Sequence, residues 1–233
     1  MVDADGKLYL VPTPIGNLGD LTSRALETLR QVALVACEDT RHSGSLLAKL
    51  GLKKKLVSYH DFNESRRARQ LLEILKAGES IAVVTDAGSP GVSDPAYRVV
   101  RVAIENNIEV VPLPGPNAII PALTASGLPT DRFFFEGFLP HKTVARKKRL
   151  EKLGAFEHTL VFYESPHRVV KTLQDMLEIL GDRKACLARE ISKKFEQFTR
   201  GSITEILDTI ASGAVKGEIV LIVEGAPSHG GKD

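Results

Sequence analysis

The stretch IAVVTDAGSPGVSDP, residues 81–95, decides the fold more than any other part of the sequence. It opens with the apolar run from Ile81 to Thr85, which has the length of a buried strand. A loop rich in glycine and proline follows, and Asp94-Pro95 then begins a predicted helix, with proline at its first position. A strand, a loop and a helix in this order are typical of a parallel α/β sheet.

The same alternation continues on both sides of this stretch. The other strands predicted in this half are 8–11, 32–36, 55–58 and 109–112. The predicted helices are 21–30, with Asp20 as N-cap, 43–50, 63–76 and 94–106. The pattern predicts a mostly parallel sheet with helices on its faces.

Proline and glycine are dense between Pro112 and Pro129, where we expect the chain to cross between two domains. Beyond the crossing, the predicted strands are 159–163, 185–189, 196–200 and 218–224, and the predicted helices are 143–153, 166–180 and 203–211. This half has more strand per helix, which favours a mixed sheet. The expected organisation is an N-terminal α/β domain (1–117), a C-terminal α/β domain with a mixed sheet (118–226) and a disordered tail (227–233).

The composition, with 43% hydrophobic and 26% charged residues among 233, is ordinary for a soluble globular protein. The formal net charge of +2 does not indicate a partner by itself. We expect no signal peptide and no membrane span. Cys37 and Cys186 have no partner at zinc spacing, so they are predicted to be buried thiols in a reducing compartment, the cytoplasm, and no metal site is expected.

Three loops rich in glycine and proline follow predicted strands, at 11–20, 85–95 and 112–118. Ligands of open α/β sheets bind outside the carboxyl ends of the strands, so these loops could converge on one crevice. Each loop alone could equally be a plain connector. No GxGxxG follows a strand, and in the late run 225–232 the glycine spacing does not fit a phosphate loop, so the usual nucleotide loops are not expected.

Two further strand ends carry dense polar residues: Ala36 to His42, which reads ACEDTRH, and Tyr163 to Arg168, which reads YESPHR. Carboxylates, histidines and arginines gathered at strand ends are typical of a site. The alternative is a salt-bridged turn that caps a helix. The sequence does not choose between the two interpretations.

Eight of these stretches together resemble the tetrapyrrole-methylase superfamily. They are VPTPIGNLGDLT (11–22), ACEDTRHS (36–43), VTDAGSPGVSDP (84–95), VPLPGPNA (111–118), GFLP (137–140), YESPHR (163–168), ARE (188–190) and KGEIVLIVEG (216–225). Within the superfamily, the chain is similar to the branch that methylates a cytidine ribose 2′-oxygen in 16S ribosomal RNA of the small ribosomal subunit. The resemblance implies two α/β domains with a cofactor cleft between them, and a homodimer.

The resemblance also implies a site for S-adenosylmethionine, held mainly by backbone groups. The residues that match are Pro12, Asp86, Ala87, Gly88, Ser89, Val92, Ser93, Asn117 and Ala118. Tetrapyrrole enzymes usually have a Gly-Asp-Pro run in the second loop, whereas this chain has Asp86-Ala87-Gly88-Ser89-Pro90. That departure favours the RNA branch.

Methyl transfer to a hydroxyl requires positioning and the removal of a proton. The candidate general bases are Glu38, Asp39, His42, Glu164 and His167. Arg41 and Arg168 could hold phosphate or orient those carboxylates. The sequence does not select one of the five.

RNA binding requires a positive surface. The predicted RNA contacts are Arg41, Arg146, Lys147, Lys148, Arg149 and Arg168. The like charges of the helix 143–153 would repel one another, and a bound RNA would relieve the repulsion; a solvated helix face is the alternative. Two other functions stay open: a tetrapyrrole-type methyltransferase for a small molecule, and a non-catalytic RNA-binding factor in ribosome assembly.

Overall fold

A computed structural model describes residues 6–60, 62–211, 213 and 215–227. The chain forms two compact units that divide between Asn117 and Ala118, and each is described by itself. Except for Pro227, the tail predicted to be disordered lies outside the described residues.

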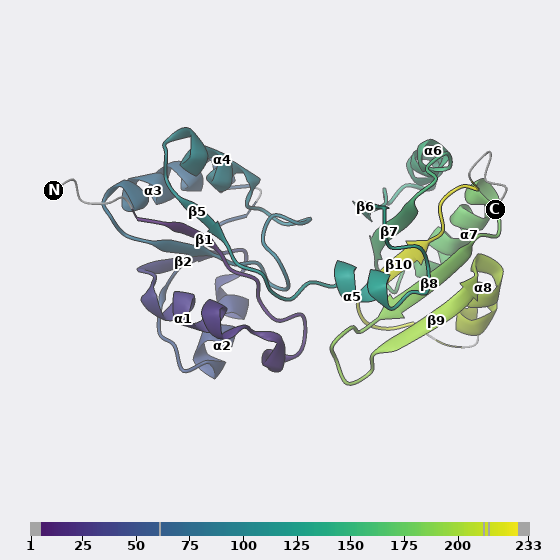
Figure 1. The fold of residues 1–233 in the computed structure, drawn as a ribbon, viewed down its shortest axis with the longest axis horizontal. Coiled ribbons are helices and arrows are strands. Elements are labelled where there is room, and N and C mark those ends of the chain that lie inside the picture. Colours follow the sequence, from purple (N-terminus) through teal and green to yellow (C-terminus); the bar gives the residue numbers. More distant parts are fainter. Residues whose placement is uncertain (1–5, 61, 212, 214, 228–233) are drawn as a thin grey trace. The chain divides into compact units, whose positions relative to one another are not determined.

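A parallel sheet forms the centre of the first unit (Figure 1). Its strands lie in the order β3-β2-β4-β1-β5, and every neighbouring pair is parallel. The strands are β1 (Leu8–Leu10), β2 (Leu34–Cys37), β3 (Lys55–Ser58), β4 (Ile81–Val83) and β5 (Val110–Pro112). The helices are α1 (Ser23–Gln31), α2 (Thr40–Lys49), α3 (Glu64–Lys76) and α4 (Tyr97–Glu105), with a short 3-10 turn, η1, at Leu18–Asp20. The carboxyl ends of all five strands therefore meet at one edge.

Both faces of this sheet are covered, α1 and α2 on one and α3 and α4 on the other (Figure 1). The alternate residues of β2 show how one strand contributes to the cores on both faces. Leu34 and Ala36 belong to the apolar core with α3 and α4, whereas Val35 and Cys37 belong to the core with α1 and α2. Successive side chains of a strand point to opposite faces, so a strand buried on both faces is a continuous apolar run. The predicted α/β class is confirmed.

Four predicted helix starts are wrong. Helix α2 begins at Thr40 rather than at 43, α7 (Val169–Leu180) of the second unit begins at Val169 rather than at 166, and the starts of α1 and α4 also differ. Thr22, not Asp20, caps α1, and its hydroxyl accepts a hydrogen bond from the amide of Ala25 at 3.1 Å. Helix α4 begins at Tyr97 rather than at Asp94-Pro95, because Ala96 has an extended φ of −164° and the helix can start only after it.

The second unit has a mixed sheet in the order β6-β7-β10-β8-β9. Only β6 and β7 run parallel; the other pairs are antiparallel. The strands are β6 (Phe133–Phe138), β7 (Thr159–Glu164), β8 (Lys184–Arg189), β9 (Gln197–Ser202) and β10 (Ile219–Val223). The helices are α5 (Ile119–Thr124), α6 (Thr143–Leu153), α7 (Val169–Leu180) and α8 (Ile203–Ala211).

Helices α6, α7 and α8 cover one face of this sheet and form an apolar core with it. Leu150, Leu173 and Ile206 of these helices pack there with Phe162 and Leu221 of β7 and β10. The short α5, which was not predicted, packs near β10. No helix in the described part of the chain is long and apolar enough to cross a membrane.

Candidate functional site

The loops after β1 and β4 are joined by hydrogen bonds at the carboxyl edge of the first sheet. The amide of Thr13 donates to the Gly88 carbonyl at 2.9 Å, and the amide of Gly88 donates back to the Thr13 carbonyl at 3.0 Å. The buried Thr13 hydroxyl donates to the Thr85 carbonyl at 3.0 Å. Neighbouring strands and three hydrogen bonds thus hold the two loops together.

The loop after β5 closes on the other two. The Ser89 hydroxyl donates to the Pro116 carbonyl at 3.2 Å. Gly115 lies so close to Pro12 that a Cβ on this glycine would stand 2.7 Å from the Pro12 Cβ. The expected convergence of the three loops is confirmed, and glycine at 115 is required because the rigid Pro12 ring lies against its backbone.

The centre of the second loop has groups suited to a ligand. Gly88 has a φ of +89°, and a Cβ there would meet Ile15 at 3.6 Å and the Pro116 carbonyl at 3.8 Å. The Asp86 Oδ1 is buried and has no hydrogen-bond partner among the described residues. The amides of Ala87 and Ser89 likewise donate no hydrogen bond within the described part of the chain. Buried polar atoms are normally paired, so a bound molecule could satisfy the Asp86 oxygen, and the accessible amides of the exposed Ala87 and half-buried Ser89 could donate to it.

Glu38 brings a fourth loop, the one after β2, to the same edge. The Thr85 hydroxyl donates to Glu38 Oε1 at 2.7 Å and fixes the direction of the carboxylate. Thr13 and Thr85 were not among the residues predicted to form the site. The sequence pattern that could have identified them is a threonine one to three residues beyond an apolar strand. A hydroxyl at that place can link the ends of adjacent strands.

Asp39, by contrast, caps helix α2. Its carboxylate accepts hydrogen bonds from the amide of Arg41 at 2.8 Å and from the Arg41 guanidinium, whose Nη2 lies 2.8 Å from Oδ2. The hydrogen bonds from the Arg41 side chain and amide lower the pKa of Asp39 to about 2. Arg41 therefore orients a carboxylate, the second of the two roles predicted for it. His42 is exposed on the same turn.

The second predicted polar cluster lies at the end of β7, in the other unit. Glu164 is buried there, accepting hydrogen bonds from the amide of Ser165 at 2.7 Å and from the Thr172 hydroxyl at 2.5 Å. Arg168 lies 3.4 Å from Glu164 and also donates to the Leu139 carbonyl at 2.7 Å. The pair thus ties α7 to the chain after β6. His167 is exposed beside it.

Among the residues predicted to hold the cofactor, Val92 and Ser93 belong to the β4–α4 loop, Ser93 with a φ of +63°. Asn117 ends the first unit, and its Cα lies 3.9 Å from a Cβ built on Gly88. Ala118 begins the second unit as the N-cap residue of α5.

The prediction that Arg146 contacts RNA is wrong, because its side chain is buried. Its side chain is 3% exposed, and its Nη2 lies 2.6 Å from Oδ2 of the equally buried Asp175 on α7. A second nitrogen of Arg146, Nη1, donates to the His141 carbonyl at 3.0 Å. The guanidinium packs α6 onto α7, and the sequence could not show this because Asp175 is 29 residues away.

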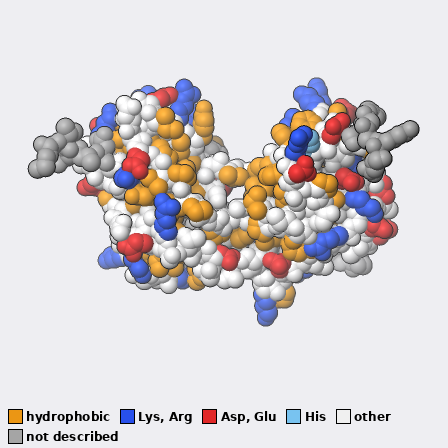
Figure 2. Space-filling view, in the orientation of Figure 1, with side chains coloured by type: hydrophobic (Ala, Val, Ile, Leu, Met, Phe, Trp, Pro, Cys, Tyr) orange, Lys and Arg blue, Asp and Glu red, His pale blue; other side chains and the backbone are white. Residues whose placement is uncertain are grey.

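The predicted repulsion along α6 is also wrong, because acidic side chains of neighbouring elements neutralise it. Figure 2 shows Lys and Arg side chains over α6 with acidic ones among them. Lys147 lies 2.5 Å from Glu178 of α7, and Arg149 lies 2.5 Å from Glu136 of β6. Lys148 is exposed and forms no ion pair with any described residue. The helix therefore presents much less free positive charge than its sequence indicates.

Both cysteines are free and buried, as predicted, and burial raises the pKa of Cys37 and, to about 11, that of Cys186. Within the described ranges, no group of three or more His, Cys, Asp or Glu side chains is arranged to hold a metal ion.

Comparison with known proteins places these features in one family. The family described as Tetrapyrrole (Corrin/Porphyrin) Methylases matches residues 7–207. The "Ribosomal RNA small subunit methyltransferase I" of Haemophilus influenzae is 51% identical over 236 aligned positions, which cover 100% of this chain and 83% of the relative. The protein of the same name from Escherichia coli O157:H7 is 49% identical, over 96% of this chain and 79% of the relative.

Solved structures have the same fold at low identity. Diphthine synthase superposes with a TM-score of 0.71 at 13% identity, over 94% of this chain and 90% of that one. Uroporphyrin-III C-methyl transferase from Thermus thermophilus, complexed with S-adenyl homocysteine, superposes with a TM-score of 0.62 at 22% identity, over 94% and 97%.

Proposed function

The chain belongs to the tetrapyrrole (corrin/porphyrin) methylase family, and on that premise we propose that it methylates the 2′-oxygen of a cytidine ribose in 16S ribosomal RNA of the small subunit. As a member of the family it is a methyltransferase, and S-adenosylmethionine is its methyl donor. The observation that carries the RNA substrate is the 49–51% identity, over nearly the whole chain, to proteins named for ribosomal RNA.

The loops of the first unit fit the methyl donor. The unpartnered Asp86 Oδ1, the amides of Ala87 and Ser89 and the backbone of Gly88 would hold it, together with Pro12, Val92, Ser93, Asn117 and Ala118. When bound, S-adenosylmethionine supplies an electrophilic methyl group on its sulfonium. The protein contributes loops fixed by the Thr13–Gly88 and Ser89–Pro116 hydrogen bonds, so little ordering is needed when the donor binds.

Among the five candidate general bases, Glu38 is the one that the geometry favours. Its carboxylate is oriented by Thr85, which belongs to the donor loop. Asp39, with a pKa of about 2, is a weak base at neutral pH. Glu164 is buried, and both of its oxygens accept hydrogen bonds. His42 and His167 are exposed and remain candidates.

The substrate is proposed to be RNA rather than a tetrapyrrole. The loop Asp86-Ala87-Gly88-Ser89-Pro90 lacks the Gly-Asp-Pro run of the tetrapyrrole enzymes. A protein of 25.4 kDa has limited surface with which to read a unique sequence, so we expect recognition of the shape of the assembled subunit. The proposal further includes a cytoplasmic location and a homodimer, for which light scattering should give twice 25.4 kDa.

Transfer of a labelled methyl group from S-adenosylmethionine tests the proposal. Purified, unmodified small ribosomal subunits are the substrate, and nuclease digestion then maps the label; naked 16S RNA and uroporphyrinogen III are run in parallel. We expect label on one cytidine 2′-oxygen, in subunits far more than in naked RNA. Label on the tetrapyrrole alone would favour the small-molecule enzyme. Donor binding without any transfer would favour the non-catalytic assembly factor.

A further inference from the structure

Strand β6 has a one-residue bulge in its pairing with β7. Phe135 lies opposite Val161, but Gly137, two residues on, lies opposite Phe162, the very next residue of β7. Glu136 is the extra residue, and Gly137 adopts a φ of +75° that a larger side chain would strain. A bulge of this kind reverses the face to which every later side chain of the strand points.

The reversal moves Phe138 to the face opposite α6, α7 and α8. Phe162 belongs to the core beneath those helices, so its neighbour Tyr163 points to the other face. Phe138 pairs with Tyr163 across the two strands and shares its face. In a regular strand Phe138 would lie on the helix face, where Glu136 pairs with Arg149 of α6. The bulge therefore exposes a phenylalanine that simple alternation would bury.

Three rings form a row on this face: Phe135, Tyr163 and Phe138. The Tyr163 ring lies between the others, with its centroid 5.1 Å from that of Phe135 and 5.6 Å from that of Phe138. These distances are within the range of packed aromatic pairs, so each ring supports the next. Phe138 is nevertheless 58% exposed, so much of its side chain is available to another molecule at the end of the row.

Positive charge borders the exposed end of the row. Residues 138 to 149 contain no carboxylate. Lys142 is exposed and forms no ion pair with the described residues, and Arg168 donates to the Leu139 carbonyl and lies 3.3 Å from His141. The nearby carboxylate of Glu164 is buried and lies 3.4 Å from Arg168, so these two charges offset each other and Lys142 supplies the net positive charge. The bordering charge favours an anionic ligand over a second apolar protein surface.

We propose that the aromatic row of Phe135, Tyr163 and Phe138 stacks an unstacked nucleobase of the RNA substrate on Phe138, with Lys142 near the adjoining phosphate. The inference rests on the proposed function and adds to it the surface that grips the RNA. RNA-binding proteins stack splayed bases on aromatic rings and neutralise phosphates with neighbouring cations. Three rings are far too small an area for a stable dimer interface, which needs about 800 Å² per partner.

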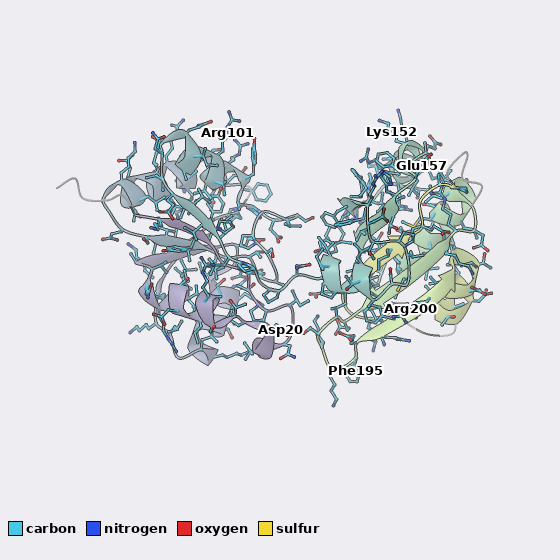
Figure 3. The ribbon with its side chains drawn as sticks, viewed as in Figure 1. Asp20, Arg101, Lys152, Glu157, Phe195 and Arg200 are labelled. Carbon is cyan, nitrogen blue, oxygen red and sulfur yellow. The ribbon has the colours of Figure 1, made fainter. Side chains whose placement is uncertain are left out.

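Methyl transfer to unmodified small subunits is the first test, with Phe195 as the matched control. Phe195 lies in the β8–β9 connection of the same unit and is 65% exposed (Figure 3). Phe138→Ala should lower kcat/KM for the subunit by about 5- to 150-fold. Phe138→Tyr should retain most of it, and Phe195→Ala should change it less than twofold. Donor affinity and Tm should be the same in all three variants.

Fluorescence gives a second readout that needs no catalysis. The chain contains no tryptophan, so Phe138→Trp introduces a single reporter. A short cytidine oligoribonucleotide should quench its emission, and high salt should reverse the quenching because phosphate contacts are lost. Phe195→Trp should not be quenched.

The outcomes separate the two proposals. Wild-type transfer with an unchanged Phe138→Ala variant overturns the stacking surface and leaves the proposed function intact. Absence of wild-type transfer to RNA overturns the proposed function, while quenching still decides whether the row stacks bases. Quenching by uroporphyrinogen III but not by the oligoribonucleotide would overturn the assignment to RNA.

Discussion

Nη2 of Arg146 lies 2.6 Å from Oδ2 of Asp175, and the two side chains are 3% and 2% exposed. The pair joins α6 to α7 within the core of the second unit, where α6 also contributes Leu150 and Leu153. Removal of one partner leaves a buried charge without compensation, so this arginine cannot be exchanged as if it lay on a solvated helix face.

We expect Arg146→Met and Asp175→Ala each to lower the free energy of unfolding by about 3–5 kcal/mol, measured by urea denaturation. The double variant Arg146→Met/Asp175→Leu should recover most of the loss, since neither charge is then left alone. Lys148→Ala, on the exposed side of α6, should change stability by less than about 0.5 kcal/mol. If both single variants were as stable as wild type, the pair would not hold α6 to α7.

Thr85→Val should reduce methyl transfer by about tenfold, because Glu38 loses the hydroxyl that orients it at 2.7 Å. Thr85→Ser keeps a hydroxyl and should recover most of the rate. The measurement is single-turnover transfer at saturating donor. Equal transfer rates for Thr85→Val and the wild type would show that the activity does not depend on the orientation of Glu38 by Thr85.

Gly88→Ala should weaken the binding of S-adenosylmethionine by at least about tenfold, measured by calorimetry. The φ of +89° costs a larger residue about 1–2 kcal/mol, so the loop should shift its backbone, and Ile15 and Pro116 of the neighbouring loops lie in van der Waals contact with the new Cβ. Gly51→Ala is the control: it has a φ of +70° and open space around it, so it should lose similar stability but bind the donor normally. Equal affinity in both variants would remove the second loop from the donor site.

The pKa of Asp39, lowered to about 2 from its usual 3.8, predicts a pH dependence of stability. A carboxyl whose pKa is lower in the folded state stabilises the fold above pH 3.8 and loses that contribution as the pH falls toward 2. Asp39→Asn should therefore lose less stability than wild type between those values, in urea midpoints taken along a pH series. Asp131→Asn, at an exposed position, should follow the wild type; an identical fall in all three proteins would exclude Asp39 as a contributor.

Neither cysteine should react with a thiol reagent in the native protein at neutral pH. Burial raises the pKa of both thiols, that of Cys186 to about 11, so almost no thiolate is present to react. Counting the thiols modified before and after denaturation checks this: about none, then two. Rapid modification of Cys37 in the folded protein would mean that the core beneath α2 opens readily.

Local patterns in the sequence were sufficient for the α/β class and for most elements. Apolar runs such as Ile81 to Val83 identify buried strands, and the helix at Thr143–Leu153 follows from residues within it. The loops at Thr13, Gly88 and Gly115 were also predictable as a group, because parallel strands bring their carboxyl ends to one edge. The starts of α1, α2, α4 and α7 were missed because caps depend on the φ and ψ of single residues.

Only the tertiary structure decided which charged residues are free. The sequence places Arg146, Lys147 and Arg149 on one helix but does not say that Asp175, Glu178 and Glu136 face them from α7 and β6. Likewise it places Phe138 in a strand, whereas its exposure depends on a bulge that exists only in the pairing with β7. Periodicity is local and is set by each element's own residues; burial and ion pairing depend on partners distant in sequence, which the packed structure alone brings together.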